Sequence, residues 1–249
     1  MSMSEPTPVP KRRRGIYLLP NLFTTAALFA GFYAITAAIN ERYELAAVAI
    51  FVAMILDGMD GRVARLTNTQ SEFGGEYDSM ADLISFGAAP SLVFYIWSLA
   101  GLGKAGWVAA FVHAAGAALR LARFNTQIGT ADKRYFQGLP SPSAAAIPAG
   151  FIWFCVENGI SGPDVAYISL GLMISTGLLM VSNFRYYSFK DVDLRGRMPF
   201  VKAILIMLAF AVIFTNPPLT LFLIFTGYAA SGPVMTLLML RKRRSERKV

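Results

Sequence analysis

DGMDGRVARLTNTQSEFGGEYDSMAD, residues 57–82, is the stretch around which the whole chain is organised. Two pairs of aspartates mark its ends: Asp57 and Asp60 are three residues apart, and Asp78 and Asp82 are four apart. On α-helices, residues at these spacings lie on one face, so each pair presents two carboxylates in the same direction. Long apolar segments flank the stretch on both sides. This pattern predicts two helices joined by a polar linker over residues 66–76.

Residues that follow the first two aspartates extend the acidic face. Gly61, Ala64 and Arg65 continue from Asp57 and Asp60 at helical spacing, so the face is acidic, then small, then basic. Clustered carboxylates repel one another unless protons or divalent cations neutralise them, and hard oxygen ligands suit Mg²⁺, Mn²⁺ or Ca²⁺. Small residues let a ligand approach closely, and a guanidinium can meet an anion. The pattern predicts a metal-held phosphate substrate.

The composition indicates a polytopic α-helical membrane protein. The chain has 249 residues, of which 55% are hydrophobic and 15% charged, with a mean hydropathy of +0.49. A soluble protein of this size needs more polar surface. The net charge of +8 comes from basic residues in loops and tails, where anionic lipid explains them better than nucleic acid does. Cys155 is the single cysteine, which excludes an intrachain disulfide.

The apolar pattern predicts an all-α bundle of about eight spans. Residues 1–14 are expected to be a disordered basic cytoplasmic tail, residues 15–240 the membrane domain, and residues 241–249 a second basic cytoplasmic tail. Some runs are shorter than the roughly 20 residues that a bilayer needs, so their ends must extend into the polar flanks. The expected spans lie near residues 16–39, 45–56, 77–99, 105–124, 143–157, 164–184, 200–215 and 219–240.

The distribution of lysine and arginine predicts the orientation. With eight spans and the N-terminus inside, Arg42 and Lys104 are the only two of the 23 basic residues on the outer side. This asymmetry favours cytoplasmic termini. It also places all four aspartates, together with Arg120 and Arg123, at the cytoplasmic level of the membrane. Near the start of the first span, Pro20 and Asn21 either form an N-terminal turn or bring Asn21 and Thr24 beside the site.

Written as spacing, the stretch is D-x2-D-G-x2-A-R-x8-G-x3-D-x3-D, and the position between Arg65 and Asp78 is filled by Gly74. This pattern resembles the signature of the CDP-alcohol phosphatidyltransferases, which are integral membrane enzymes of phospholipid synthesis. Eight specified residues at fixed spacing make the signal specific, although the motif covers only about a tenth of the chain. The apolar pattern agrees with the family over much of the rest.

The resemblance implies a role for each position of the motif. It implies two divalent cations, Mg²⁺ or Mn²⁺, held by the four aspartates, with Asp82 also the base that deprotonates the alcohol acceptor. Gly61, Ala64 and Gly74 would leave room for the nucleotide of a CDP-lipid, and Arg65 would contact its diphosphate. The resemblance also implies a homodimer, and a bacterial enzyme of this kind is expected in the inner membrane with its site facing the cytoplasm.

A second segment bears on the acceptor alcohol. The sequence RLARFN, residues 120–125, and the later FQGLPSP, residues 136–142, resemble the branch of the family that transfers the phosphatidyl group of CDP-diacylglycerol to L-serine. Arg120 and Arg123 are three residues apart and would meet a carboxylate or phosphate. Asn125 and Ser141 are weaker candidates for contacting serine. Alternatively, both arginines are positive-inside anchors.

Other functions stay open at this point. Glycerol 3-phosphate, inositol or inositol phosphate would serve as acceptors for the same chemistry, and two arginines also suit an extra phosphate. In a different class, the aspartates would form the cation path of a coupled transporter, or the chain would be a scaffold. The cluster lies at one end of the helices rather than at mid-membrane, which argues against a transporter. His113, the only histidine, is interpreted as a packed interior residue.

Overall fold

The computed structural model describes residues 18–126, 135–187 and 200–246. Within these ranges the chain is almost wholly helical, and the helices fall close to the expected segments. The α-helices are α1 (Leu18–Ile39), α2 (Tyr43–Thr67), α3 (Glu72–Asp82), α4 (Ala89–Phe94), α5 (Lys104–Thr126), α6 (Ser141–Glu157), α7 (Ala166–Val181), α8 (Phe200–Thr215) and α9 (Pro217–Glu246). The shorter helices are η2 (Leu83–Ala88), η3 (Tyr95–Leu99), η4 (Ala100–Leu102) and η5 (Pro163–Val165).

Five helical segments of the described chain are long and apolar enough to cross a membrane. They are residues 19–39, 72–102, 104–126, 163–181 and 217–238. The protein is therefore an integral membrane protein with several spanning helices. The other three expected spans correspond to α2, which carries Asp57 and Asp60, and to α6 and α8, which have 17 and 16 residues. Residues 1–14, expected to be a tail, lie outside the described ranges.

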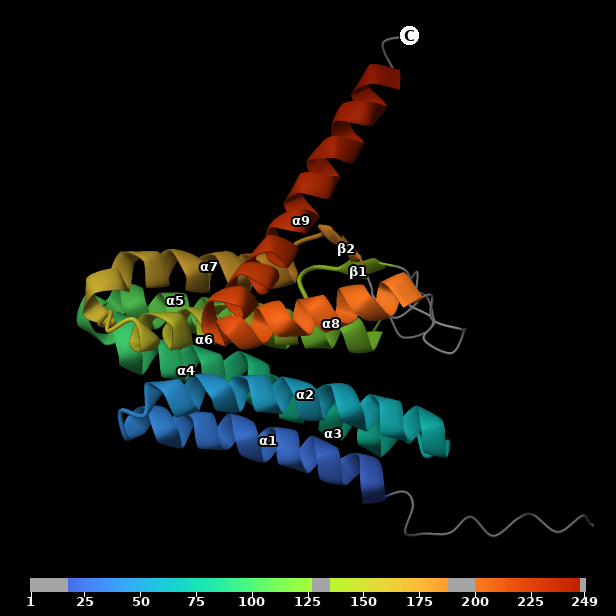
Figure 1. Cartoon of the computed structure of the whole chain (residues 1–249), viewed down its shortest axis with the longest axis horizontal. Helices are drawn as coiled ribbons and strands as arrows, with labels where there is room; N and C mark the ends of the chain where they lie inside the picture. The colour runs from blue at the N-terminus through green and yellow to red at the C-terminus, as the bar shows by residue number, and fades with distance from the viewer. Residues whose placement is uncertain (1–17, 127–134, 188–199, 247–249) are drawn as a thin grey trace, which may run out of the picture.

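The helices are arranged in two groups. Figure 1 shows α1, α2 and α3 side by side on one side of the bundle, and α5, α6 and α7 on the other, with α4 between them. Helix α9 packs on α6 and α8 at its start and then leaves the bundle. It continues as helix through the basic segment to Glu246, part of the expected C-terminal tail.

Small residues hold the first two helices together. Ala34 and Ala38 of α1 and Ala46 and Ala47 of α2 are all completely buried. Alanines on both helices let the two backbones approach closely, which is how membrane helices gain packing energy without a hydrophobic driving force. This close pair holds the aspartate-bearing end of α2 beside the start of α1.

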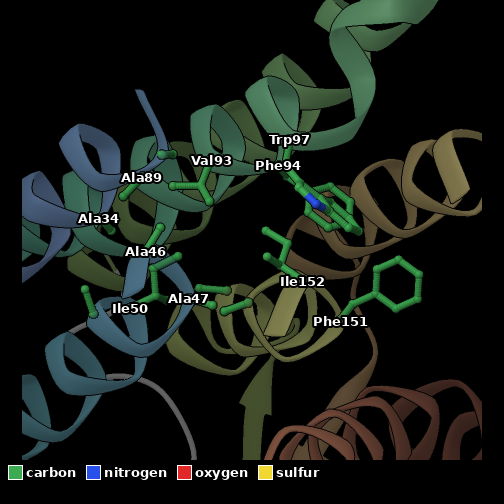
Figure 2. Packing of buried hydrophobic residues seen from close by; sticks show 14 of the residues in the cluster. Ala34, Ala46, Ala47, Ile50, Ala89, Val93, Phe94, Trp97, Phe151 and Ile152 are labelled. Atoms are coloured by element: carbon green, nitrogen blue, oxygen red, sulfur yellow. The ribbon is translucent and has the colours of Figure 1, made fainter. Parts of the chain in front are cut away.

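The core between the two groups contains an aromatic cluster. Phe94 and Trp97 lie against Phe151 of α6, with ring centroids 6.1 and 6.0 Å from that of Phe151, and Ile152 packs beside them (Figure 2). Val93, on the same segment, is fully buried against this cluster. These contacts anchor α4 and η3 in the middle of the bundle, downstream of the aspartates of α3.

The linker between α2 and α3 is shorter than expected. We predicted a polar linker to residue 76 and a helix from about Tyr77, but α3 begins at Glu72. The reason is an N-cap: Ser71 Oγ accepts a 3.0 Å hydrogen bond from the Gly74 amide, which satisfies one free donor of the first turn. Asn68 ends α2 in the left-handed conformation, with φ of 52°. Only four residues, 68–71, therefore connect α2 to α3.

A two-stranded antiparallel ribbon is the only departure from the all-α prediction within the described residues. Strand β1 (Tyr135–Gln137) pairs with β2 (Arg185–Tyr187), which joins the segment after α5 to the segment after α7. Tyr186 is completely buried and donates a 3.0 Å hydrogen bond to the Ala229 carbonyl of α9. Burial raises the pKa of Tyr186 to about 12, so the phenol remains a neutral donor. This contact fixes the ribbon on α9.

Candidate active site

The two halves of the signature meet at one place. Asp57 and Asp60 project from α2 and Asp78 from α3, and each offers a carboxylate oxygen such that the three oxygens lie within 4.8 Å of one another. The prediction that both halves are helical is confirmed, and residues 68–71 connect α2 to α3. Asp60 is the most enclosed of the three, with 6% of its surface exposed.

This cluster fits a divalent cation. Carboxylate oxygens bind Ca²⁺ at about 2.3–2.6 Å and Mg²⁺ at about 2.0–2.1 Å, so two oxygens that share an ion lie at most about 5 Å apart for Ca²⁺ and about 4 Å for Mg²⁺. The oxygens of the cluster lie within 4.8 Å of one another, so they would share Mg²⁺ after a small inward movement. Three enclosed carboxylates also repel one another, and a cation removes that repulsion. The donor set consists of hard oxygen ligands, which suits Mg²⁺ or Mn²⁺ rather than a metal that prefers sulfur or nitrogen.

Asp82 occupies a different place from the other three. Its carboxyl group lies against that of Asp57, while the Asp78 carboxyl lies against that of Asp60. Asp82 is one turn further along the chain than Asp78, at the last residue of α3. The four carboxylates therefore form two facing pairs across α2 and α3. Three of them compose a compact triad, and Asp82 stands at its edge.

Helix α1 contributes a direct contact to the cluster. The Thr24 hydroxyl donates a 2.7 Å hydrogen bond to Oδ2 of Asp60, and Thr24 itself is buried. Pro20 and Asn21 lie in the first turn of α1, and Asn21 Oδ1 would lie 3.5 Å from a Cβ added at Gly74. Both interpretations of this segment therefore hold: it is a helix start, and it lies beside the site.

The small and basic positions of the motif surround the cluster. Gly61 and Ala64 are half-buried on α2, and Arg65 is exposed but lies close enough to Asp60 for their charges to interact. A Cβ at Gly61 would lie 3.5 Å from Arg65 Nη1. A Cβ at Gly74 would lie 3.1 Å from Oγ of Ser71, the N-cap of the same helix, so the first turn of α3 is tight at this position.

Arg120 approaches the aspartates from α5. Its guanidinium donates a 2.6 Å hydrogen bond to Ser141 Oγ, at the first residue of α6. Its charge also interacts with Asp57 and Asp82. Helices α5 and α6 thus bring one arginine and one hydroxyl to the edge of the cluster. This juxtaposition joins two segments that were predicted to act together.

Arg123 and Asn125 do not join Arg120. Arg123 donates to the Ser182 carbonyl at 3.3 Å and lies 3.5 Å from Asn183 Oδ1, in the segment between α7 and β2. The Asn125 amide donates to Ser79 Oγ at 3.1 Å, on the helix turn next to Asp78. The two arginines share a helix, yet only Arg120 faces the carboxylates, while Asn125 links the end of α5 to α3.

Two neighbours of the site had no clear signal in the sequence. Ser79 follows Asp78 directly and bonds Asn125, but a lone serine in a helix predicts little. Tyr228 of α9 lies near the Arg120 guanidinium and donates a 3.1 Å hydrogen bond to the Tyr187 carbonyl. Its position depends on how α9 docks, which no local pattern reports.

Comparison with known proteins agrees with the geometry. The model of the CDP-alcohol phosphatidyltransferase family matches residues 17–183. A CDP-diacylglycerol–serine O-phosphatidyltransferase of Helicobacter pylori is 37% identical over 202 residues, covering 81% of this chain and 84% of the relative. Proteins of the same name from Mycobacterium tuberculosis and Methanocaldococcus jannaschii are 36% and 35% identical, covering 70% and 57% of this chain and 63% of each relative.

The chain belongs to the CDP-alcohol phosphatidyltransferase family. The match contains α1 to α7, and therefore every residue of the aspartate cluster together with Arg120 and Ser141. The relatives all carry a name that specifies serine as the acceptor. A transporter or a non-catalytic scaffold has no support from these comparisons.

Proposed function

We propose that the protein transfers the phosphatidyl group of CDP-diacylglycerol to the hydroxyl of L-serine, with release of CMP. The observation that carries the proposal is the convergence of Asp57, Asp60 and Asp78 within 4.8 Å, with the Arg120–Ser141 pair beside them. The family supplies the reaction class, and the names of the relatives favour serine over glycerol 3-phosphate or inositol.

The aspartates have separable roles in this proposal. Asp57, Asp60 and Asp78 would hold divalent cations, and Asp82 would complete the ligands for two Mg²⁺ or Mn²⁺ ions. When bound, the ions neutralise the diphosphate and stabilise the departing CMP. Gly61, Ala64, Arg65 and Gly74 receive the CDP part of the lipid on the side of α1 and α3.

Asp82 is the candidate base. The serine oxygen attacks the β-phosphorus, the bond from that phosphorus to the oxygen of CMP breaks, and the serine proton passes to the Asp82 carboxylate. A general base contributes typically ~10²–10⁴-fold, so positioning and charge neutralisation carry more of the rate than proton transfer does. The Thr24 hydroxyl already donates to Asp60 and the Ser141 hydroxyl already accepts from Arg120, so direct attack by serine is favoured over a covalent intermediate.

Arg120 is the candidate for the serine carboxylate. A guanidinium forms paired, charge-assisted hydrogen bonds with a carboxylate, and Ser141 Oγ already holds this one in place. Arg123 has its own partners in the segment after α7, so it contributes indirectly, by holding that segment against the end of α5. Asn125 contributes through Ser79, next to Asp78.

The membrane arrangement follows from the reaction. We propose a membrane domain over residues 15–240 with about eight spans, both termini cytoplasmic, in the inner membrane of a bacterium. Water-soluble serine and the head group of the lipid then meet at the cytoplasmic face. A homodimer is proposed from the family resemblance alone, and cross-linking of the protein in membranes tests it.

The decisive test is CMP release by the purified protein. CDP-diacylglycerol and Mn²⁺ or Mg²⁺ are supplied with serine, glycerol 3-phosphate, inositol, inositol phosphate or choline in parallel. Serine-dependent CMP release that EDTA and Asp82→Asn both abolish is the expected result. Release with another alcohol only would refute serine as the acceptor, and no release with any acceptor would refute the transferase.

A further inference from the structure

The helix that carries Asp78 and Asp82 is irregular directly after Asp82. Residues Leu83–Ala88 form a π-helical turn, in which the Ala89 amide donates to the Ile84 carbonyl, five residues back. In a regular α-helix the Phe86 carbonyl would accept from the amide of residue 90, which is Pro90 and has no N–H. The sequence therefore leaves the Phe86 carbonyl without its usual donor, deep inside the bundle.

His113 of α5 supplies that missing donor. Its Nε2 lies 3.2 Å from the Phe86 oxygen, and the imidazole is completely buried. A carbonyl oxygen only accepts, so Nε2 carries the proton, and in the neutral ring Nδ1 is an acceptor. The Thr176 hydroxyl of α7 lies 2.7 Å from Nδ1 and completes the arrangement. The prediction that His113 is a packed interior residue is confirmed, and its bonds are specific.

The same turn is held from α1 on its other side. Ser85 Oγ donates a 3.1 Å hydrogen bond to the Ala27 carbonyl. A Cβ at Gly31 would lie 2.7 Å from Ser85 Cα, so only glycine permits this approach of α1 to the turn. The π-helical turn is thus pinned between α1 and α5, and neither contact touches a carboxylate of the cluster.

We infer that His113 is a positioning residue for the aspartate site: by holding the Phe86 carbonyl it maintains the π-helical turn that sets the rotation of α3 about its axis. Downstream of the turn, Val93 and Phe94 anchor α4 in the core. Upstream lie Asp78 and Asp82. In a regular helix each residue turns the chain by about 100°, so a change in the winding of this turn, once the Phe86 carbonyl loses its donor, would rotate both aspartates relative to Asp57 and Asp60.

The test measures metal binding separately from turnover, because the inference rests on the aspartate site of the proposed function. His113→Phe removes the donor, while His113→Gln keeps an N–H able to reach the Phe86 oxygen. Mn²⁺ binding to each detergent-purified variant is followed by the electron paramagnetic resonance signal of free Mn²⁺. We expect His113→Phe to bind Mn²⁺ at least about tenfold more weakly and to lose kcat, and His113→Gln to recover most of both.

Ser98→Ala is the matched control. Ser98 Oγ donates to the Gly162 carbonyl at 2.7 Å and lies 2.9 Å from Ser169 Oγ, so it makes buried bonds between the same long helical segment and the start of α7, but it is distant in sequence from the aspartates. This variant should keep the Mn²⁺ affinity of the wild type. The inference is overturned if His113→Phe binds Mn²⁺ normally, if His113→Gln fails to recover, or if Ser98→Ala weakens binding equally.

Two further outcomes are separable. If His113→Phe does not fold, Thr176→Val takes its place. This variant keeps the Nε2 donor of His113 but removes the hydroxyl that holds Nδ1. It should weaken Mn²⁺ binding by about threefold, less than the loss expected for His113→Phe. Unchanged binding in that variant would overturn the inference. If the wild type binds Mn²⁺ yet releases no CMP with serine, the proposed function fails while the role of His113 is still decided by Mn²⁺ affinity.

Discussion

Thr24 of α1 donates a 2.7 Å hydrogen bond to Oδ2 of Asp60, the most enclosed carboxylate of the cluster. The bond links the first helix, which carries none of the signature aspartates, to the proposed metal ligands. The same carboxylate offers an oxygen within 4.8 Å of oxygens of Asp57 and Asp78. A partner of this kind fixes the rotamer of a ligand.

Replacing Thr24 with valine tests this contact. Valine has nearly the same shape but no hydroxyl, and a hydrogen bond to a charged group contributes about 1.5–3 kcal/mol. We expect the Mn²⁺ concentration for half-maximal activity to rise roughly 10- to 100-fold, since each 1.4 kcal/mol is about tenfold. Thr24→Ser retains the hydroxyl and should stay near the wild type. Equal behaviour of the two variants would contradict the role of the bond.

Asp78→Asn should abolish turnover. The amide keeps the size of the side chain but removes one charge and a strong ligand, so kcat should fall by at least about 100-fold. Asp164→Asn is the matched control, because Asp164 is an exposed residue of η5, before α7, whose carboxylate accepts a hydrogen bond from Ser161. Steady-state CMP release measures both. Retained activity in Asp78→Asn would remove this residue from the site.

Arg120 and Arg123 should differ in their effect on serine. Lysine keeps the charge but loses the planar fork of the guanidinium. Because Arg120 faces the cluster and Arg123 bonds the Ser182 carbonyl, we expect Arg120→Lys to raise the KM for serine by about tenfold. Arg123→Lys should change it by less than about threefold. The opposite order in serine titrations would show that the second arginine meets the acceptor.

Two glycines of α7 should respond in opposite ways to alanine. A Cβ at Gly177 would lie 2.6 Å from the Val112 carbonyl, so Gly177→Ala must separate α5 from α7. Gly171, on the same helix, has open space around its Cα. We expect Gly177→Ala to lower Tm by several degrees, and Gly171→Ala to leave it unchanged or raise it, since alanine is favoured over glycine in helices by roughly 0.5–1 kcal/mol.

Thermal unfolding in detergent, followed by circular dichroism, compares these two variants. If Gly177→Ala is as stable as Gly171→Ala, α5 and α7 do not approach each other closely enough at Gly177 to exclude a methyl group. That crossing lies next to the His113–Thr176 bond, so Gly177→Ala should also weaken Mn²⁺ binding.

Much of this architecture could be predicted because its signals are local. Apolar runs of helical length give the spans, and spacings of three and four place the aspartates on shared helix faces. The start of α3 was missed because Gly74 and Gly75 usually indicate a loop, whereas here they lie within a capped first turn. The ribbon of β1 and β2 was missed because strands of three residues carry too little pattern.

The parts of the site that escaped prediction depend on tertiary packing. Which arginine faces the carboxylates is set by the rotation of α5, and that rotation follows from its crossing with α7 at Gly116 and Gly177. Tyr228 lies near Arg120 because α9 docks on α6 and on the ribbon, where Tyr186 bonds the Ala229 carbonyl. The local sequence around Arg120 and Tyr228 carries no pattern that predicts these tertiary contacts.

Because of Pro90, the aspartate motif of residues 57–82 is not sufficient on its own to rebuild the site in another protein. It lies about two turns beyond Asp82, yet its missing N–H frees the Phe86 carbonyl at the turn that aims Asp78 and Asp82. Grafting residues 57–82 onto another pair of membrane helices would copy every signature residue and still misdirect half of the carboxylates. A designer who wanted this chemistry in a new scaffold would have to import the downstream proline and a histidine on a third helix as well.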